Sequence, residues 1–275
     1  MIYQNSSDMA TPSAATLNSP MADFKSPTGI TGFLKAMLIA VILLLFVNFY
    51  HTWNDFQYLQ SVSNSADYRS GQVIELDIPF SGPRALTVLL YAVTYLTAWI
   101  TFLVWVYRMN KNTHAFGGVE LTYTPGWAVG WFFIPIANLI KPYFVVQEIY
   151  KASRHPVQWR QVSANMLIAA WWICWLAGSL LGGPSKAHGD STMLLPMLTF
   201  QKIHLAAMAV FIVSLGLEFL IITEIADLQN ALFRYLSENP DKHPSAAACQ
   251  NQGMENSPVP SCRKETEQTS LYQRV

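Results

Sequence analysis

Charged residues are scarce in this chain of 275 residues, and the charges cancel. Lys and Arg number 17, Asp and Glu also number 17, and charged residues make up 12% of the sequence, about half the share of an ordinary soluble protein. A chain without net charge has no global field that would recruit a polyanion. We therefore predict no nucleic-acid partner.

Cysteine and catalytic motifs are scarce as well. The three cysteines are Cys174, Cys249 and Cys262, and their irregular spacing predicts neither a disulfide framework nor a zinc site. The sequence contains no phosphate-binding glycine loop, zinc-binding helix or nucleophile elbow. We expect a protein that is not an enzyme and that uses no cofactor and no metal.

Apolar residues are abundant and occur in long blocks. Hydrophobic residues make up 52% of the chain, and a helix needs about 20 of them in a row to cross a bilayer. An all-α, polytopic transmembrane helix bundle is therefore predicted. Its four spans are expected at about residues 32–50, 85–107, 163–183 and 203–226.

The remaining segments are predicted from their polar composition. Residues 1–31 and 237–275 lack hydrophobic periodicity and are expected to form disordered cytoplasmic tails around a transmembrane domain at 32–236. Residues 51–84 are expected to form a loop with a short helix near 53–61, and residues 184–202 a second loop.

One apolar stretch differs from the four spans. The sequence from Pro125 to Tyr143 reads PGWAVGWFFIPIANLIKPY, and its apolar part, 126–140, is interrupted by Pro135, which removes a helical hydrogen bond. A run this short is typical of a re-entrant or interfacial hairpin, although a fifth span remains the alternative. Residues 142–154 follow as an amphipathic helix that is predicted to lie on the membrane surface.

The distribution of basic residues predicts the orientation. If 126–140 does not cross, one side of the membrane carries Lys25, Lys35, Arg108, Lys111, Lys141, Lys151, Arg154 and Arg160, and the other only Arg69, Arg84, Lys186 and Lys202. This is a positive-inside pattern, which predicts that both termini lie in the cytoplasm. The membrane itself is expected to be the cell inner (plasma) membrane. With five spans the bias disappears.

The same stretch carries a resemblance to a known family. Together with residues 147–153, which read QEIYKAS, it resembles the signature of a bacterial membrane-protein family catalogued as domain of unknown function 4328. The resemblance extends roughly from Gly32 to Tyr235. It implies a membrane location and architecture, and it implies no activity.

Three polar residues in apolar surroundings form the candidate intramembrane site. A carboxylate inside a span costs about 2.5 to 3.5 kcal/mol, so Glu218 needs a partner or water. We favour a structural interhelical polar contact for Glu218; the functional hypothesis is that it pairs with Lys35, or stays protonated and relays protons. Asn138 follows the Pro135 break and either binds a solute in a re-entrant loop or satisfies freed backbone groups.

A second candidate site is the basic surface formed by Lys141, Lys151, Arg154 and Arg160, which would attract anionic lipid headgroups or a partner protein. Glu148 and Lys151 are interpreted as a solvated pair on the surface helix. His51 and His204 are expected at the outer interface as hydrogen-bonding residues. The tryptophans of the third span are interpreted as packing or lipid-facing residues.

Two functions fit these residues. The first is a non-enzymatic scaffold or regulatory protein whose partners are membrane lipids, other membrane proteins or a second copy of the chain. The second is a small-solute or proton pathway that uses the broken stretch and Glu218. A pathway requires Glu218 and Asn138 to face a common cavity, whereas a scaffold lets them lie in separate helix contacts.

Overall fold

The computed structural model describes residues 21, 23–71, 82–182, 194–239 and 242–244, and every element of regular structure in these ranges is a helix. The predicted all-α fold is confirmed for this part of the chain. Most of the two tails predicted to be disordered, and part of each predicted loop, lie outside the described residues.

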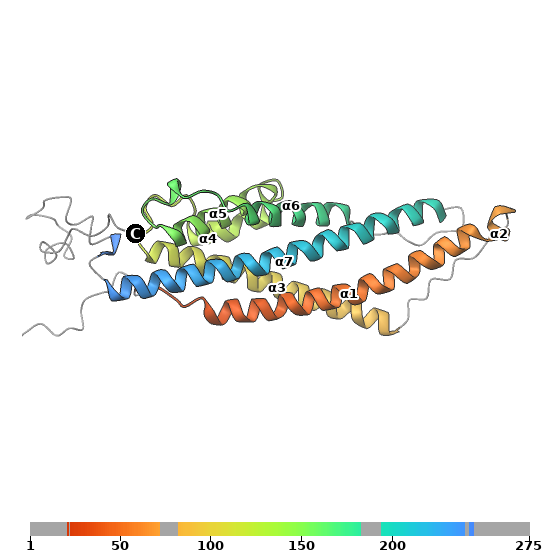
Figure 1. Ribbon diagram of the computed structural model, residues 1–275, viewed down its shortest axis with the longest axis horizontal. Helices are drawn as coiled ribbons and strands as arrows, with labels where there is room; N and C mark the ends of the chain where they lie inside the picture. The colour runs from red at the N-terminus through yellow and green to blue at the C-terminus, as the bar shows by residue number, and fades with distance from the viewer. Residues whose placement is uncertain (1–20, 22, 72–81, 183–193, 240–241, 245–275) are drawn as a thin grey trace, which may run out of the picture.

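Three helices are long and apolar enough to cross a membrane: α1 (Thr28–Asn64), α3 (Gly82–Ala115) and α7 (Leu194–Glu238). A fourth apolar helix, α6 (Met166–Leu181), is shorter. At 1.5 Å per residue α6 is about 24 Å long, whereas α1 and α7 reach about 55 and 67 Å. The four helices lie along the long axis of the molecule, and consecutive ones run in opposite directions (Figure 1).

Between α3 and α6 the chain forms a hairpin, residues 125–154. It descends through α4 (Pro125–Gly130) and the single 3₁₀ turn η2 (Trp131–Phe133), and it returns through η3 (Ala137–Leu139) and α5 (Lys141–Arg154). Pro135 lies at the reversal, where no helix is continuous. The short helices α2 (Ala66–Arg69) and η4 (Trp159–Gln161) complete the described elements.

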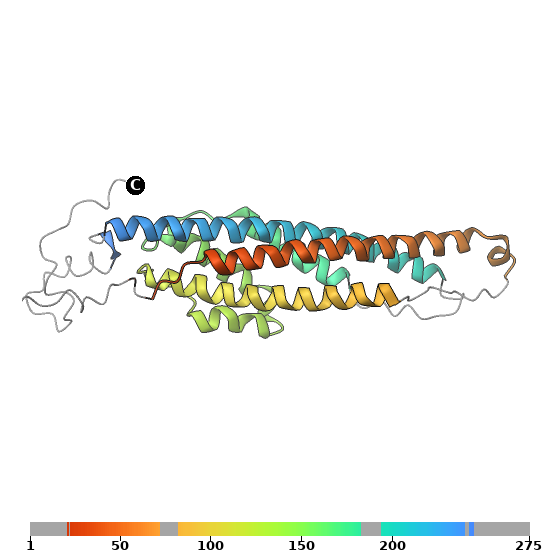
Figure 2. The ribbon, with the colours of Figure 1, turned by 90° about the horizontal axis from the view of Figure 1, so that it is seen from below.

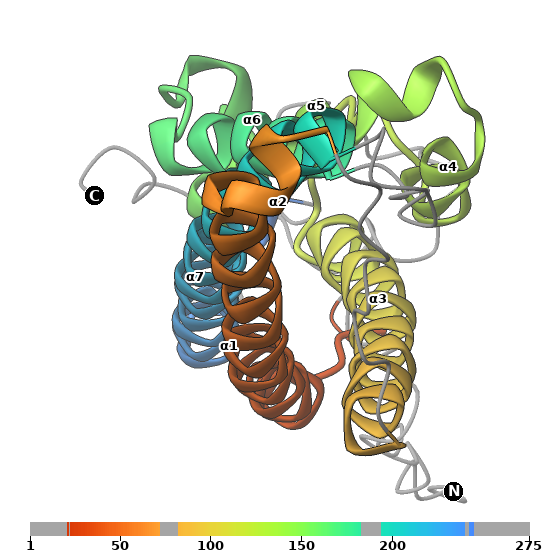
Figure 3. The same cartoon turned by 90° about the vertical axis from the view of Figure 1, so that its right-hand side faces the viewer.

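The elements form a closed ring when they are viewed along the long axis (Figure 3). α1 packs between α3 and α7, and α7 packs between α1 and α6. The hairpin joins the two free sides, because α4 and α5 contact α3 while α5 also contacts α6 and α7. The start of α1 and the end of α7 lie at one end of the ring, hereafter the tail end, with the end of α3 (Figure 2).

α1 is longer than the sequence predicts. It continues past His51 to Asn64 without a break, so the helix predicted near 53–61 is present as part of α1, and the prediction of a loop beginning at residue 51 is wrong. The physical reason is a small apolar cluster remote from the tail end, in which Phe56 and Leu59 pack with residues of α7. This tertiary packing holds a helix that hydropathy alone does not detect.

α7 is extended by the same cluster. It begins at Leu194, inside the loop predicted at 184–202. Leu194, Met197, Leu198 and Leu205 are its contributions to the cluster. Since α7 is one continuous helix to Glu238, it connects both ends of the molecule.

α5 begins and ends as predicted but does not lie on a surface. Val145, Val146 and Ile149 are buried in the main core, and the polar Gln147 and Glu148 are buried as well. The prediction of a surface helix is therefore wrong. An amphipathic helix can also be buried when the residues of its polar face form hydrogen bonds with other parts of the protein, as they do in α5.

Two side-chain amides, one buried and one half-buried, tie the elements together. Gln229 of α7, which is fully buried, donates through Nε2 to the Met109 carbonyl and to Ser153 Oγ, both at 3.0 Å, and its Oε1 accepts from Asn112 Nδ2 at 2.8 Å. This network joins α7 to α3 and to the hairpin. Asn165 caps α6 and donates to Glu224 Oε2 of α7 at 3.1 Å.

The outer surface of the ring is strongly apolar. Large side chains with high exposed fractions occur on every wall, including Leu43 of α1 (61%), Leu89 of α3 (59%), Ile136 at the tip of the hairpin (81%) and Leu180 of α6 (75%). Apolar surface this extensive is typical of a face that meets lipid or another protein.

Candidate functional site

A small cavity lies inside the ring and receives side chains from every wall. It has a volume of about 40 Å³. Its lining residues are Leu38 of α1, Tyr95, Ala98, Trp99 and Phe102 of α3, Phe132 and Asn138 of the hairpin, Trp171, Trp172 and Trp175 of α6, and Leu215 and Glu218 of α7. Of these, only Glu218 carries a formal charge.

Glu218 is buried, with 8% of its surface exposed. No ion pair with Glu218 occurs among the described residues, whose three salt bridges are Arg84–Asp55, Lys111–Asp23 and Arg160–Glu120. A buried carboxylate without a cationic partner is costly. The cavity is therefore the main candidate for a functional site among the described residues.

Asn138 reaches the same cavity from the hairpin. Its Oδ1 is buried and has no hydrogen-bond partner in the described structure. The backbone beside it is satisfied differently, because Trp172 Nε1 donates to the Leu139 carbonyl at 3.0 Å. Asn138 thus leaves a hydrogen-bond acceptor free inside the protein, where nearly every such group is paired.

Lys35 does not join this site. Its Nζ lies 5.3 Å from the centroid of the Phe219 ring, and no ion pair links it to Glu218. Lys35 lies one helical turn before Leu38, which lines the cavity, and therefore on its tail side. The predicted Lys35–Glu218 pair is not formed.

A larger hollow of about 480 Å³ lies between α1, α3, α6 and α7, on the side of the cavity remote from the tail end; we call it the vestibule. Tyr95 lines both the vestibule and the cavity. His51 and His204 both line the vestibule. Among the described residues, no group of three or more His, Cys, Asp or Glu side chains could hold a metal ion.

The vestibule is bordered by one ion pair. Arg84, which lines it, donates from its two terminal nitrogens to the two oxygens of Asp55, at 2.9 and 2.5 Å. Bidentate pairs of this kind have a fixed geometry. The pair joins the start of α3 to the distal part of α1.

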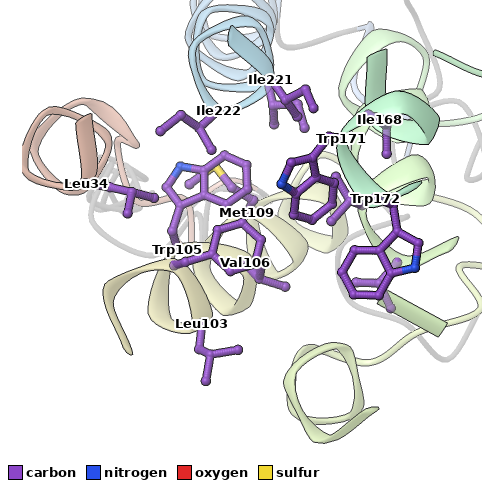
Figure 4. Packing of buried hydrophobic residues seen from close by; sticks show 14 of the residues in the cluster. Leu34, Leu103, Trp105, Val106, Met109, Ile168, Trp171, Trp172, Ile221 and Ile222 are labelled. Atoms are coloured by element: carbon purple, nitrogen blue, oxygen red, sulfur yellow. The ribbon is translucent and has the colours of Figure 1, made fainter. Parts of the chain in front are cut away.

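On the tail side the cavity is closed by a hydrophobic plug. Figure 4 shows its side chains converging from all four helices. Its members, which have no exposed surface, are Leu34, Trp105, Val106, Met109, Ile168 and Ile222. Trp105 is also fixed by a hydrogen bond from its Nε1 to Thr31 Oγ1, at 3.0 Å.

The predicted basic surface is divided among separate local contacts. Lys141 lies over the ring of Trp131, at 5.3 Å from its centroid, and Arg160 forms an ion pair with Glu120. Arg154 Nη1 donates to Tyr150 Oη at 2.9 Å. Lys151 is half-buried on α5.

Glu148 has a structural role instead of the predicted pairing with Lys151. Its carboxylate accepts hydrogen bonds from the backbone N–H groups of Thr122 and Tyr123, at 2.9 and 3.1 Å. Burial, and secondly the charge of Glu148, raise the pKa of the Tyr123 phenol above its ordinary value. The interpretation of Glu148 as a solvated residue is wrong, because its partner is a loop backbone that sequence spacing does not reveal.

The aromatic walls of the cavity were not assigned to the site from the sequence. Tyr91, Tyr95 and Trp99 recur every fourth residue and so lie on one face of α3. On α6, Trp172 stacks on Trp175 at 4.8 Å between ring centroids. Two such stripes on consecutive apolar helices were the available signal, although the same spacing is common in ordinary packing.

A comparison with family models gives one match. The model described as Domain of unknown function (DUF4328) matches residues 83–226, just over half of the chain. It covers the hairpin and both aromatic stripes, and it begins after α1, so it is narrower than the resemblance drawn from the sequence. No curated protein and no solved structure matches the chain.

Proposed function

Because the chain belongs to the family described as Domain of unknown function (DUF4328), we propose its function from its own geometry: it is an integral membrane protein that provides a pathway for a small solute. The observation that carries this proposal is the cavity that Glu218 and Asn138 share. A pathway requires such a common site, whereas separate helix contacts would suffice for a scaffold.

Membrane insertion accounts for the apolar outer surface. Three helices have the length and composition to cross a bilayer, and lipid would cover their exposed side chains without cost. We propose four crossings, by α1, α3, α6 and α7, with the hairpin entering and leaving at the tail end. The excess of Lys and Arg at that end supports a cytoplasmic location for both termini in the inner (plasma) membrane.

The vestibule, the cavity and the plug follow one another along the long axis of the ring, and this order supports a pathway with one closed gate. The vestibule lies on the side remote from the tail end, the cavity lies next to it at Tyr95, and the plug fills the tail side. Transporters built on broken helices place their sites in this way, near the middle of the bilayer and against a discontinuous segment. In this proposal the plug must rearrange before a solute passes.

The scaffold hypothesis has less support than it had from the sequence. It depended on a basic helix on the membrane surface, and α5 is largely buried while its basic residues are dispersed. Lipids remain expected partners of the apolar exterior. They require no specific basic surface for that role.

Solute entry into vesicles tests the proposal. Purified protein is reconstituted into liposomes, the vesicles are shrunk in hypertonic urea, glycerol or ethylammonium chloride, and re-swelling is followed by light scattering. We expect at least one solute to enter faster than into empty vesicles. The Glu218→Gln variant should slow that entry by about tenfold, the effect of losing about 1.4 kcal/mol of interaction.

A matched control is available on the same helix. Asp227 is exposed on α7 and lines neither the cavity nor the vestibule, so Asp227→Asn makes the same chemical change and should leave entry unchanged. Size-exclusion chromatography and thermal unfolding verify that both variants fold. If all three solutes enter no faster than into empty vesicles, the pathway proposal is wrong.

A further inference from the structure

The walls of the cavity are unusually rich in aromatic rings. They comprise Tyr95, Trp99, Phe102, Phe132, Trp171, Trp172 and Trp175. The rings meet at varied angles: Phe102 and Phe132 are 75° apart in plane, Trp171 and Trp172 are 55° apart, and Trp172 and Trp175 are nearly parallel at 12°. Aromatic faces carry negative potential, and a desolvated cation over them gains up to about 2 kcal/mol per ring.

The polar groups of the cavity also favour a cation. No Lys, Arg or His lines it, and its one formal charge is the carboxylate of Glu218. Asn138 Oδ1 adds a buried acceptor without a partner. Trp171 Nε1 makes no hydrogen bond of normal geometry, although its N–H lies close enough to the Glu218 carboxylate to interact with it. An indole N–H carries no formal charge and does not exclude a cation. Carboxylate, amide oxygen and ring faces together match a positively charged hydrogen-bond donor.

Size restricts the ligand further. One water needs about 10–15 Å³ of such volume, so about 40 Å³ accommodates roughly three non-hydrogen atoms. A metal ion would not use the ring faces fully, and hard cations prefer several oxygen ligands. A small alkylammonium ion presents both N–H donors and an apolar end.

We infer that the cavity binds a small primary alkylammonium ion, whose ammonium group contacts Glu218 and Asn138 and whose alkyl group lies among the tryptophans. This inference rests on the proposed function, since it names the class of solute for the same site. The charged and aromatic groups select a cation over a neutral molecule of equal size.

Binding is measured on the full-length protein in lipid nanodiscs, with ethylammonium chloride as the probe. Tryptophan fluorescence and thermal unfolding report occupancy, because a ligand that binds the folded state raises its stability. Ethanol has the same number of non-hydrogen atoms without the charge, and sodium chloride controls for ionic strength. We expect a saturable response to ethylammonium that ethanol and sodium chloride do not produce.

Three variants locate the site. Glu218→Gln should weaken ethylammonium binding tenfold or more, while Asp227→Asn should leave it unchanged. Trp175→Leu removes one aromatic face and should weaken binding by roughly two- to thirtyfold. Since Trp175 is half-buried, thermal unfolding without ligand verifies that this variant still folds.

Two results would overturn the inference: equal responses to ethylammonium and ethanol, or the same ethylammonium affinity in wild-type and Glu218→Gln protein. The vesicle assay separates this failure from that of the proposed function. If urea or glycerol still enters through the protein, the pathway stands and the solute class is wrong. If ethylammonium binds but no solute enters, the site is confirmed and the pathway is wrong.

Discussion

Glu148 is the residue on which the connection between α3 and the hairpin depends. Its carboxylate, 3% exposed, accepts from two consecutive backbone N–H groups, those of Thr122 and Tyr123. The carbonyl of Tyr123 is in turn bound by His114 Nε2 of α3, at 3.1 Å. Glu148 therefore holds the loop against α5, and His114 holds the same loop against α3.

Replacement of this carboxylate should destabilise the protein. In Glu148→Gln one of the two N–H groups faces an amide donor in place of an acceptor, and a buried unsatisfied group costs about 1–3 kcal/mol. The measurement is unfolding in detergent by heat or by added denaturing detergent. Glu120→Gln is the control, since Glu120 lies in the same loop and only forms an exposed ion pair with Arg160, worth about 0–1 kcal/mol. Equal losses in both variants would contradict the assigned role of Glu148.

Candidate residues could be identified from the energetic cost of placing a polar group in a membrane span, but their hydrogen-bond and ion-pair partners could not be predicted. Glu218 and Asn138 were found because polar groups in apolar runs need an explanation, and they do line one cavity. The partner of Glu218 was not predictable, because hydropathy places Lys35 at the right depth without giving the direction of its side chain. The assignment of Glu148 failed for the same reason.

Among the elements, the contact between α6 and α7 depends on one glycine. A Cβ at Gly178 would lie 3.2 Å from Cβ of Phe211, closer than ordinary van der Waals contact. Gly178→Val should therefore force the two helices apart and cost about 1–3 kcal/mol of stability.

Gly216 of α7 is the matched control. A Cβ there would meet no atom within 4 Å, so Gly216→Ala should be neutral or stabilise the helix by up to about 1 kcal/mol. Thermal unfolding in detergent compares the two variants with the parent protein. A Gly178→Val protein as stable as the parent would show that the helices do not need close approach at this position.

Hydropathy predicted which elements exist but not how far they extend. The four apolar helices and the Pro135 break were all found from the sequence, because long apolar runs and an interior proline are strong signals. The distal part of α1 was predicted only as a separate short helix near 53–61, since residues after His51 are mixed in polarity and are held in one continuous helix by packing on α7. The surface interpretation of α5 failed because its polar face binds protein groups in place of water.

For the whole molecule, the decisive prediction concerns the side of the membrane on which each end lies. Gln158 is exposed between α5 and α6, and Ser70 is exposed after α2. With Cys174, Cys249 and Cys262 replaced, Ser70→Cys should react with a membrane-impermeant thiol reagent in intact cells. Gln158→Cys should react only after permeabilisation.

The protein without cysteine is the control for background labelling. Labelling of both positions in intact cells would mean that the hairpin crosses the membrane, and the proposal of four crossings would be wrong. The position chosen for the label must also be exposed on the protein surface. Ala152, also in the hairpin, has no exposed surface and would stay unlabelled in either topology.

The Gln229 network also has a consequence for the order in which the protein is made. Asn112 and Ser153 leave the ribosome long before Gln229, which lies 117 and 76 residues later in the chain. Until α7 has been synthesised, the amide of Asn112 and the hydroxyl of Ser153 lack this shared partner. The hydrogen bonds that join α3 to the hairpin through Gln229 can therefore form only after α7 has been made.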